Sequence, residues 1–449
     1  MARPSRNEFT SRVRGLTDRI REDIRTGKLA PGHYLPSELE LAGTFGLSKE
    51  SVRKALDVLV EEGLITKIKR VGNRVEPRTM LRFAYYPSME AEVGMAERLA
   101  AFEAAHPGIS VQPVPTPFPA EYIEHGVADV AALTNWDAMK WRERDPAFAR
   151  LERAPHTEAA HPRLHRPFLA ADGGAAAAPF VFSPVVLAYN RAHLSSCGLE
   201  EPRDGWTWYT LLKTARALER ERRIAGFGAH MQSVNRWTVF LLQNGFRFGE
   251  PATASAADDP SLWESLRVAR DLVHRQGEPL RHWTENDADA ERWFQEGRIS
   301  MIMTSYFGLH RLRIGELDYG VSKLPMLRND ATLLLVTGLI VAKDAKHPEA
   351  ARSLVSYLCG LEGQSDIRRS ALTLPAHPGA LRIRDGLTGN RPSREPDLQR
   401  LWDGCKDYAD LHLTTTALEA IREELKGYWA KLEDETEAGS RLESIFAGG

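Results

Sequence analysis

A short basic segment near the N-terminus carries residue types that can read DNA. Arg53 and Lys54 lie in the first turns of a predicted helix, shortly after Ser48, Lys49 and Ser51. A guanidinium group can donate two hydrogen bonds to the edge of a guanine, so Arg53 is assigned to base recognition. The serine hydroxyls and the lysine ammonium suit phosphate oxygens, whose contacts fix a protein's position on the duplex. The spacing therefore indicates a DNA-reading helix.

Three helices are predicted around this segment. Apolar residues spaced by three and four predict an amphipathic helix over 8–26. Ser37 and Glu40 form a capping box at the start of a second helix, and Ser48 caps a third helix over 49–62. Two helices joined by a tight turn predict a helix-turn-helix, whose second helix enters the major groove.

A basic two-stranded ribbon is predicted to follow these helices. Residues 64–75 alternate around Gly72-Asn73, which is typical of a hairpin, and this wing can reach a second stretch of DNA backbone or the minor groove. The alternative interpretation is a solvated charged face on a small helical domain. Outside the third helix, the predicted DNA contacts are Ser37, Lys69, Arg70, Gly72 and Asn73.

These residues resemble the GntR family of bacterial regulators. The match runs through Leu35-Pro36-Ser37-Glu38, Gly46-Leu47-Ser48, Val52-Arg53-Lys54-Ala55-Leu56 and Glu62-Gly63-Leu64-Ile65. The resemblance implies a winged helix-turn-helix domain over residues 1–78. It also implies a homodimer that binds double-stranded operator DNA at an inverted repeat.

Three positions depart from the family pattern. Leu39 and Lys49 stand where the family usually has arginine, and Arg70 replaces a wing glycine. We therefore expect an operator that differs from the family's common one.

The remainder of the chain is predicted to be an α/β region. Strands are expected over 80–86, 109–114 and 129–133, with a helix over 90–106 between the first two. In such sheets ligands bind at the carboxyl ends of the strands.

Polar and aromatic side chains follow two of these strands and suit a sugar. Pyranose rings stack their C–H faces on aromatic rings, while polar groups bind the hydroxyls. Tyr86 and Ser88 follow the first strand, and Asn135, Trp136 and Asp137 follow the strand over 129–133. Trp237 is a further candidate beside polar residues. For each aromatic residue the alternative is packing in a core.

An ordered set of weak motifs resembles the family 1 extracellular solute-binding proteins, the group of the maltose-binding protein. The motifs are Asp172-Gly173-Gly174 before four alanines, Trp206-Thr207-Trp208, 293–298 before a strand over 299–303, Tyr319-Gly320-Val321, and Gly338–Ala342 before His347-Pro348. The resemblance implies a two-lobed clamp over residues 79–449 that closes on a sugar. The implied lobe one is about 80–182 and 338–376, and lobe two is about 184–336 and 378–449.

The same resemblance implies further ligand contacts. Crossovers between the lobes are expected near 180–184, 336–340 and 375–378, and Ser183 lies at the first. Tyr306 and Phe307 stand where the family commonly has a glycine-x-tryptophan stacking element, with Ser305 replacing the glycine and Phe307 the tryptophan.

Composition divides the chain in the same way. Residues 1–78 have a net charge of +5 and the rest −7, so one end is expected to meet a polyanion. An apolar membrane span and a signal-peptide core are both absent from the sequence, and the three cysteines lie far apart. We therefore expect a cytoplasmic protein without a disulfide framework.

Enzyme, cofactor and metal interpretations are set aside. His161 and His165 are spaced like metal ligands, but no third ligand accompanies them. An aminotransferase-like body would need a Schiff-base lysine, and neither Ser48-Lys49 nor Ser322-Lys323 has that context. Glycine-rich phosphate loops and nucleophile elbows are also lacking.

The sequence thus predicts a sugar-responsive, DNA-binding transcription regulator. The alternative is an intracellular solute-binding protein whose basic head docks a protein or membrane instead of DNA.

Overall fold

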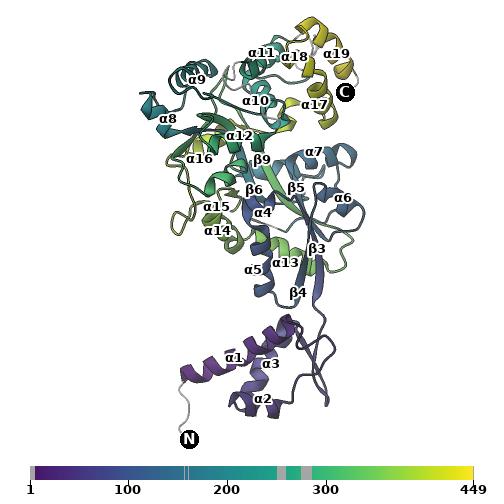
Figure 1. The fold of residues 1–449 in the computed structure, drawn as a ribbon. Helices are drawn as coiled ribbons and strands as arrows, with labels where there is room; N and C mark the ends of the chain where they lie inside the picture. The colour runs from purple at the N-terminus through teal and green to yellow at the C-terminus, as the bar shows by residue number, and fades with distance from the viewer. Residues whose placement is uncertain (1–5, 156, 160, 250–258, 275–285, 448–449) are drawn as a thin grey trace.

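The computed structural model describes residues 6–155, 157–159, 161–249, 259–274 and 286–447. A small head, residues 6–78, lies at one end of a larger two-lobed body (Figure 1). The C-terminus lies at the opposite end of the body from the head.

The head is a three-helix unit with a two-stranded wing. Its core is formed by fully buried side chains that include Leu16, Val52 and Leu56. The elements are α1 (Arg6–Arg25), α2 (Glu38–Phe45), α3 (Lys49–Glu61), β1 (Ile65–Ile68) and β2 (Gly72–Val75).

The helix boundaries of the head follow from local capping. The Ser37 hydroxyl accepts the Glu40 amide at 3.2 Å, and the Ser37 amide donates to the Glu40 carboxylate at 2.8 Å. Gly46 ends α2 in the left-handed conformation, with φ of 61°. The Ser48 hydroxyl then accepts the Ser51 amide at 3.2 Å and starts α3.

The wing turns earlier than the sequence pattern predicted. Gly72 pairs with Ile68 and Asn73 with Lys67, so both predicted turn residues belong to β2. The turn is made by the residues between the strands, where Arg70 has φ of 64°. Arg70 thus occupies a conformation that glycine adopts more easily.

Lobe one is a mixed sheet covered by helices on both faces (Figure 1). The sheet order is β10-β6-β9-β5-β3-β4, with β3, β4 and β5 parallel to one another and β9 antiparallel to β5. The strands are β3 (Thr79–Tyr85), β4 (Ile109–Pro115), β5 (Val130–Thr134), β6 (Ala178–Asn190), β9 (Thr332–Val341) and β10 (Leu374–Pro375). The helices are α4 (Met89–Val93), α5 (Met95–Ala105), α6 (Pro119–Glu124), α7 (Asn135–Arg144), η1 (Pro162–Leu164), η2 (Arg166–Phe168), α13 (Pro348–Cys359), α14 (Leu361–Ser370) and α15 (Pro378–Leu381).

Lobe two is built on the second half of β6. The strands are β7 (Met301–Ser305), β8 (Tyr319–Ser322) and β11 (Cys405–Lys406). The helices are α8 (Arg191–Ser196), α9 (Trp208–Arg222), α10 (Val234–Asn244), α11 (Pro260–His274), α12 (Asp287–Gln295), η5 (Gly308–Arg313), α16 (Leu398–Gly404), η6 (Tyr408–Leu411), α17 (Thr415–Glu424), α18 (Lys426–Trp429) and α19 (Glu435–Ala447). Trp206 and Trp208 pack in this lobe's core.

Two long strands pass from one lobe to the other. β6 pairs with β9 over Ala178–Pro184 and then changes partners to β7 and β8 from Val185 onward. β9 pairs with β11 at its start and with β5 at its end. Every residue of both strands is buried.

Two expectations about this region need correction. The predicted helix over 90–106 is two helices, because Gly94 adopts φ of 65° between α4 and α5. The final crossing lies after Leu381 rather than at 375–378, because α15 still packs on α14 and β10 of lobe one. The chain has reached lobe two by Ser393, whose amide donates to the Tyr319 carbonyl at 2.8 Å.

A candidate ligand cleft and a candidate DNA-binding surface

A cavity of about 520 Å³ lies between the two lobes. Lobe one contributes residues of the β3–α4 connection and of the start of α7. The crossing strand β9 forms its floor with Leu335, Val336 and Thr337, and lobe two closes the other side. The lobe-two lining consists of His230, Gln232, Ser233, Val234, Asn235, Asn286, Asp287, Phe307, Tyr408, Glu419 and Arg422.

Aromatic rings from both lobes face this cleft. Trp136 of lobe one and Tyr408 of lobe two meet edge to face, with ring centroids 5.0 Å apart and planes at 71°. The Tyr408 hydroxyl donates to the Asn235 side chain. Tyr86 and Phe307 add two further rings to the lining. Such rings offer faces and edges on which the C–H surface of a sugar can pack.

The lobe-one wall is held by a hydrogen-bond network at the start of α7. The Thr134 hydroxyl accepts the Asp137 amide at 3.1 Å and caps the helix. The Tyr86 hydroxyl donates to the Asp137 carboxylate. Burial raises the pKa of Tyr86, and the neighbouring Asp137 carboxylate adds to the rise. The Asn135 amide is committed to the backbone of β9, donating to Leu334 O at 2.9 Å. The network therefore fixes the position of the Tyr86 ring.

Carboxylic groups give the cleft hydrogen-bonding capacity for hydroxyls. Asp287 forms an ion pair with the buried Arg236 at 3.0 Å. Glu92 lies on α4, and burial raises its pKa to about 7, with Glu291 adding to the rise. The Glu291 carboxyl lies behind the lining, where it accepts the Thr304 hydroxyl at 3.0 Å.

The structure brings only some of the predicted ligand residues together. Tyr86, Ser88, Asn135, Trp136 and Phe307 line the cleft, and Asp137 lies behind Tyr86 as its hydrogen-bond partner.

Three other predicted ligand residues lie in the interior. Trp237 is 0% exposed and packs near Trp429, with ring centroids 6.0 Å apart. The Ser183 hydroxyl accepts the Tyr306 amide at 2.6 Å and donates to Pro184 O at 2.8 Å, at the point where β6 changes lobes. Tyr306 itself is 2% exposed. Because their side chains are occupied by packing or by backbone contacts, we leave these residues out of the site.

Sequence reasoning missed most of the lobe-two wall. His230, Gln232 and Asn235 precede or start α10, where a run of polar residues before an apolar helix was the available signal. Tyr408 and Asp287 carry no local signal, because tertiary packing alone brings them to the cleft.

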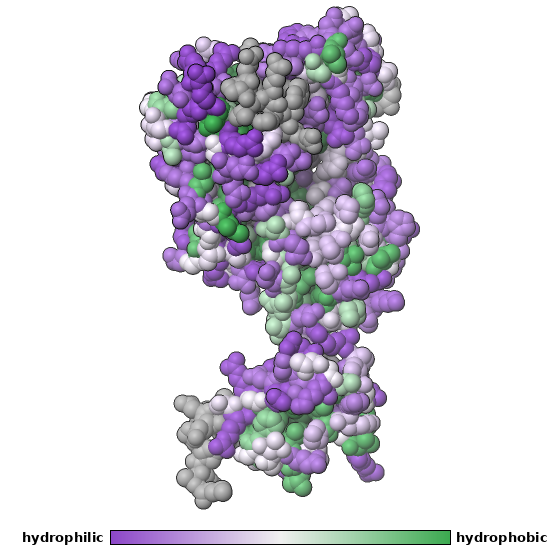
Figure 2. All heavy atoms as spheres, in the orientation of Figure 1, coloured by the Kyte–Doolittle hydropathy of each residue, from purple (hydrophilic) through white to green (hydrophobic). Residues whose placement is uncertain are grey.

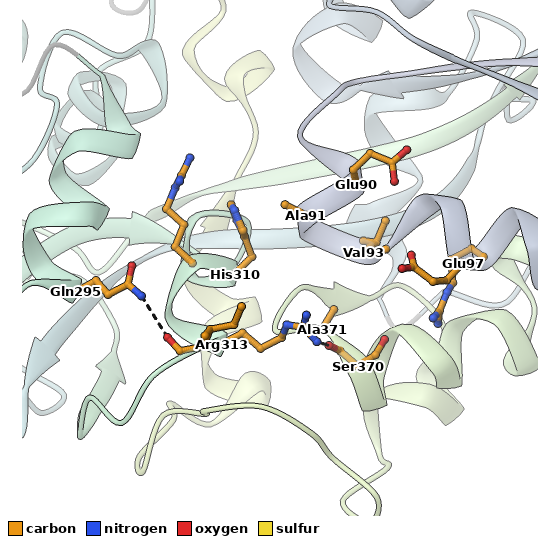
Figure 3. Close-up of a pocket in the computed structure, with 13 residues that line it drawn as sticks. Glu90, Ala91, Val93, Glu97, Gln295, His310, Arg313, Ser370 and Ala371 are labelled. Atoms are coloured by element: carbon orange, nitrogen blue, oxygen red, sulfur yellow. Dashed lines mark hydrogen bonds between the residues drawn. The ribbon is translucent and has the colours of Figure 1, made fainter.

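A second pocket, of about 580 Å³, lies between α4 and α5 of lobe one and η5 of lobe two (Figure 3). Glu90 and Glu97 of lobe one contribute one part of its lining, while His310 and Arg313 come from η5 of lobe two. Carboxylates and guanidinium groups both line this pocket, so its charge favours neither anionic nor cationic ligands.

The head presents a basic face on α3. Arg53 and Lys54 keep 61% and 71% of their side chains exposed, and Lys49 is also exposed. The Arg53 Nε donates to the Glu38 carboxylate at 2.8 Å. Exposed ion pairs of this kind contribute little energy, so the guanidinium can exchange this partner for DNA.

The predicted DNA contacts divide into exposed and buried groups. Ser51 is 4% exposed and its hydroxyl lies 2.7 Å from that of Ser48. Asn73 is 7% exposed, since its strand faces the head's interior. These two side chains are left out of the proposed DNA surface. The exposed members are Ser37, Ser48, Lys49, Arg53, Lys54, Lys69, Arg70 and Gly72.

Within the described part of the chain, the helices lack the length and apolarity to cross a membrane, and groups of three or more metal-ligating side chains are absent.

Sequence profiles of two families match separate parts of the chain. The profile described as "Bacterial regulatory proteins, gntR family" matches residues 13–75. The profile described as "Bacterial extracellular solute-binding protein" matches residues 86–365, more than half of the chain.

Two curated bacterial regulators match a short stretch of the chain. The mannosyl-D-glycerate transport/metabolism system repressor MngR of Escherichia coli is 44% identical over 63 residues, covering 14% of this chain and 26% of that protein. The transcriptional repressor NagR of Bacillus subtilis is 40% identical over 65 residues, covering 14% and 27%. The chain thus spans about a quarter of the length of these relatives.

Solved structures match the body. The GacH receptor of Streptomyces glaucescens superposes with a TM-score of 0.68 at 17% identity, covering 83% of this chain and 98% of that one. The substrate-binding protein Lmo0181 of Listeria monocytogenes, in complex with cycloalternan, gives 0.64 at 18% identity, covering 83% and 98%. At this identity the likeness concerns the fold. The chain therefore belongs to the bacterial extracellular solute-binding protein family, and it carries an N-terminal winged-helix domain of the GntR type.

Proposed function

We propose that the protein is a transcription regulator whose clamp binds a sugar or oligosaccharide and thereby alters operator binding by the head. The observation that carries the proposal is the union, in one chain, of an exposed basic recognition helix and an aromatic-lined interlobe cleft. A transport receptor would need the cleft alone.

The relatives support the two halves of this proposal separately. MngR, which matches 63 residues of this chain, is named as the repressor of a mannosyl-D-glycerate transport/metabolism system. The matched structures include proteins bound to acarbose, maltose, maltopentaose, D-tagatose and D-mannitol.

In the proposed mechanism the sugar lies between Trp136 and the lobe-two wall. Its hydroxyls are bound by carboxyl and amide groups such as Asp287 and Asn235. Because Trp136 belongs to lobe one, whereas Asp287 and Asn235 belong to lobe two, the closed clamp binds the sugar more tightly than the open one. A ligand shifts an equilibrium only by such a difference in affinity.

The head acts as a dimer on DNA in this proposal. Two-fold symmetry of a homodimer matches an inverted-repeat operator, with half-sites about one helical turn or a multiple apart. We place the protein in the cytoplasm, where operator DNA and imported sugars meet.

The test is a fluorescence anisotropy titration of a labelled duplex taken from upstream of the gene. The titration is repeated with acarbose, maltose, maltopentaose, D-tagatose and D-mannitol as a fixed panel. We expect salt-sensitive binding to the duplex and a shift of the curve by at least one sugar.

The sign of the shift tells whether ligand releases or recruits the protein. Absence of DNA binding at low salt contradicts the regulator proposal and favours a head that docks another partner. If the protein binds the duplex but no sugar of the panel shifts the binding curve, the result contradicts the proposal that these compounds are its ligands.

A further inference from the structure

The head is joined to lobe one by a very short segment. β2 ends at Val75 and β3 begins at Thr79, so only the three residues Glu76–Arg78 lie between them. The Glu76 amide still donates to Leu64 O of the head at 3.0 Å, and the Thr79 amide already donates to Gly108 O of lobe one at 2.8 Å. Pro77, between them, has a fixed φ. This segment has little freedom to bend.

Arg78 fastens the segment to two elements of lobe one. Its Nε donates to Pro107 O at 3.0 Å, and its Nη2 donates to the Glu103 carboxylate at 3.1 Å and to Ile109 O. Glu103 lies on α5 and also accepts the amide of Val111, in β4, at 2.6 Å. The guanidinium therefore binds the end of α5 and the start of β4 together.

Gly108 brings the recognition helix itself into contact with lobe one. A Cβ atom at this position would lie 2.5 Å from the backbone oxygen of Glu62, the C-cap residue that follows α3. A backbone oxygen at a helix end cannot move aside as a flexible side chain can, so only glycine permits this approach. Figure 2 shows the same junction as a narrow neck between head and body.

The first helix of the head is tied to the same point. Arg21 of α1 donates to both carboxylate oxygens of Glu62, at 3.1 and 2.7 Å. This bidentate geometry fixes orientation as well as distance, and it raises the pKa of Arg21. Both long helices of the head thus meet at the residue that contacts Gly108.

The strand that receives the head leads directly into the cleft. β3 pairs with β4 along its whole length, from Thr79 to Tyr85. Tyr86, Ser88 and Glu92, which line the cleft, follow within a few residues. Lobe two makes none of the junction contacts described above.

From these contacts we infer that the head and lobe one form a single rigid body, and that Gly108, Arg78 and the Arg21–Glu62 pair are its positioning residues. The next step rests on the proposed function. When the clamp closes on a sugar, lobe two moves relative to the head, while the recognition helix α3 keeps its position on lobe one. Sugar binding therefore changes the position of lobe two relative to the DNA-bound head. In a dimer, this movement changes which surfaces of the two protomers can contact each other.

The experiment measures distances between nitroxide spin labels in the full chain. Cys197 is partly exposed and would react with the label, so it is replaced by serine. Cys359 and Cys405 are buried and are kept. Labels are placed at Gly43→Cys in the head, Glu121→Cys in lobe one and Tyr209→Cys in lobe two, in pairs. All three positions are exposed. We expect one narrow distance distribution for the head–lobe one pair.

Gly108→Phe tests the junction, and Gly15→Phe is the matched control. A Cβ at Gly15 meets no atom within 4 Å. We expect Gly108→Phe to broaden and lengthen the head–lobe one distances while the lobe one–lobe two distances stay as in the parent. Gly15→Phe should change neither. Arg78→Gln, which adds no bulk, should broaden the head–lobe one distribution without lengthening it greatly.

Two results would overturn the inference. One is a head–lobe one distribution in the parent that is already as broad as in Gly108→Phe. The other is a panel sugar that moves the head relative to lobe one as much as it moves lobe two. A panel in which no sugar moves the lobes counts instead against the proposed function, because the rigid body is measured without ligand or DNA.

Discussion

Arg53 projects from the first turns of α3, where its guanidinium lies against Glu38 on the surface of the head. Its interaction with Glu38 places it beside α2, the helix that carries Leu39 in place of the family's usual arginine. Leu39 is 65% exposed. Because the Leu39 side chain offers no phosphate contact, we expect, under the proposed function, that a larger share of recognition depends on Arg53.

Arg53→Ala should weaken operator binding by about 1–3 kcal/mol and relax sequence discrimination, because a bidentate contact to a base is lost. Anisotropy titrations with the upstream duplex and a scrambled duplex measure both effects. Lys54→Ala is the control, and we expect it to weaken both duplexes alike. Equal binding of parent and Arg53→Ala to all DNAs would contradict the recognition-helix assignment.

Trp136→Ala and Trp237→Ala should separate ligand binding from packing. Trp136 lines the cleft, so its loss should cost about 1 kcal/mol or more of sugar binding with little effect on unfolding. Trp237 is 0% exposed, so its loss should lower the free energy of unfolding by about 3–5 kcal/mol. Calorimetric titration and thermal unfolding measure the pair. A strong loss of stability in Trp136→Ala would assign that ring to the core.

The partly buried side chain of Glu92 predicts a pH dependence of stability. Its pKa is raised from 4.5 to about 7 by burial, so the folded protein holds this proton more tightly than the unfolded chain does. The stabilisation of the folded state by protonated Glu92 is therefore complete at low pH, and it is lost as pH rises towards 7 and above. In Glu92→Gln, without ligand, the fall in Tm between about pH 5 and about pH 8 should be smaller than in the parent. The exposed Glu121→Gln should retain the full fall.

At the scale of elements, local signals and tertiary contacts contribute differently. The capping box at Ser37 and the cap at Ser48 operate within four residues, and they allowed the starts of α2 and α3 to be predicted from sequence. The break between α4 and α5 at Gly94 was not predicted, because a glycine within a helical pattern does not by itself indicate a left-handed φ. Tyr408 and Asp287 were missed because their place in the cleft depends on how separate segments of lobe two pack.

Ser37→Ala tests the cap of α2. Removing the hydroxyl leaves the Glu40 amide without its acceptor, so the head should lose about 1 kcal/mol of stability. Urea unfolding followed by a signal from the head measures this loss. Ser11→Ala, at an exposed position inside α1, should have no destabilising effect, since alanine favours helix interiors.

At the scale of the whole molecule, lobe two is expected to move towards the rigid body formed by the head and lobe one. A panel sugar that binds should reduce the radius of gyration measured by small-angle scattering, because the lobes approach each other. Trp136→Ala at the same sugar concentration should retain the open dimensions. A sugar that binds tightly and leaves the scattering curve unchanged would contradict a closing clamp.

The position of β9 within the sheet has a consequence for synthesis on the ribosome. The head has its own core, whereas lobe one cannot join β5 to β6 until β9, residues Thr332–Val341, has been made. At ribosomal rates of about 5–20 residues per second, roughly ten to fifty seconds separate the two events. The nascent chain therefore carries a complete DNA-binding unit well before it has a sensor that can answer to a sugar.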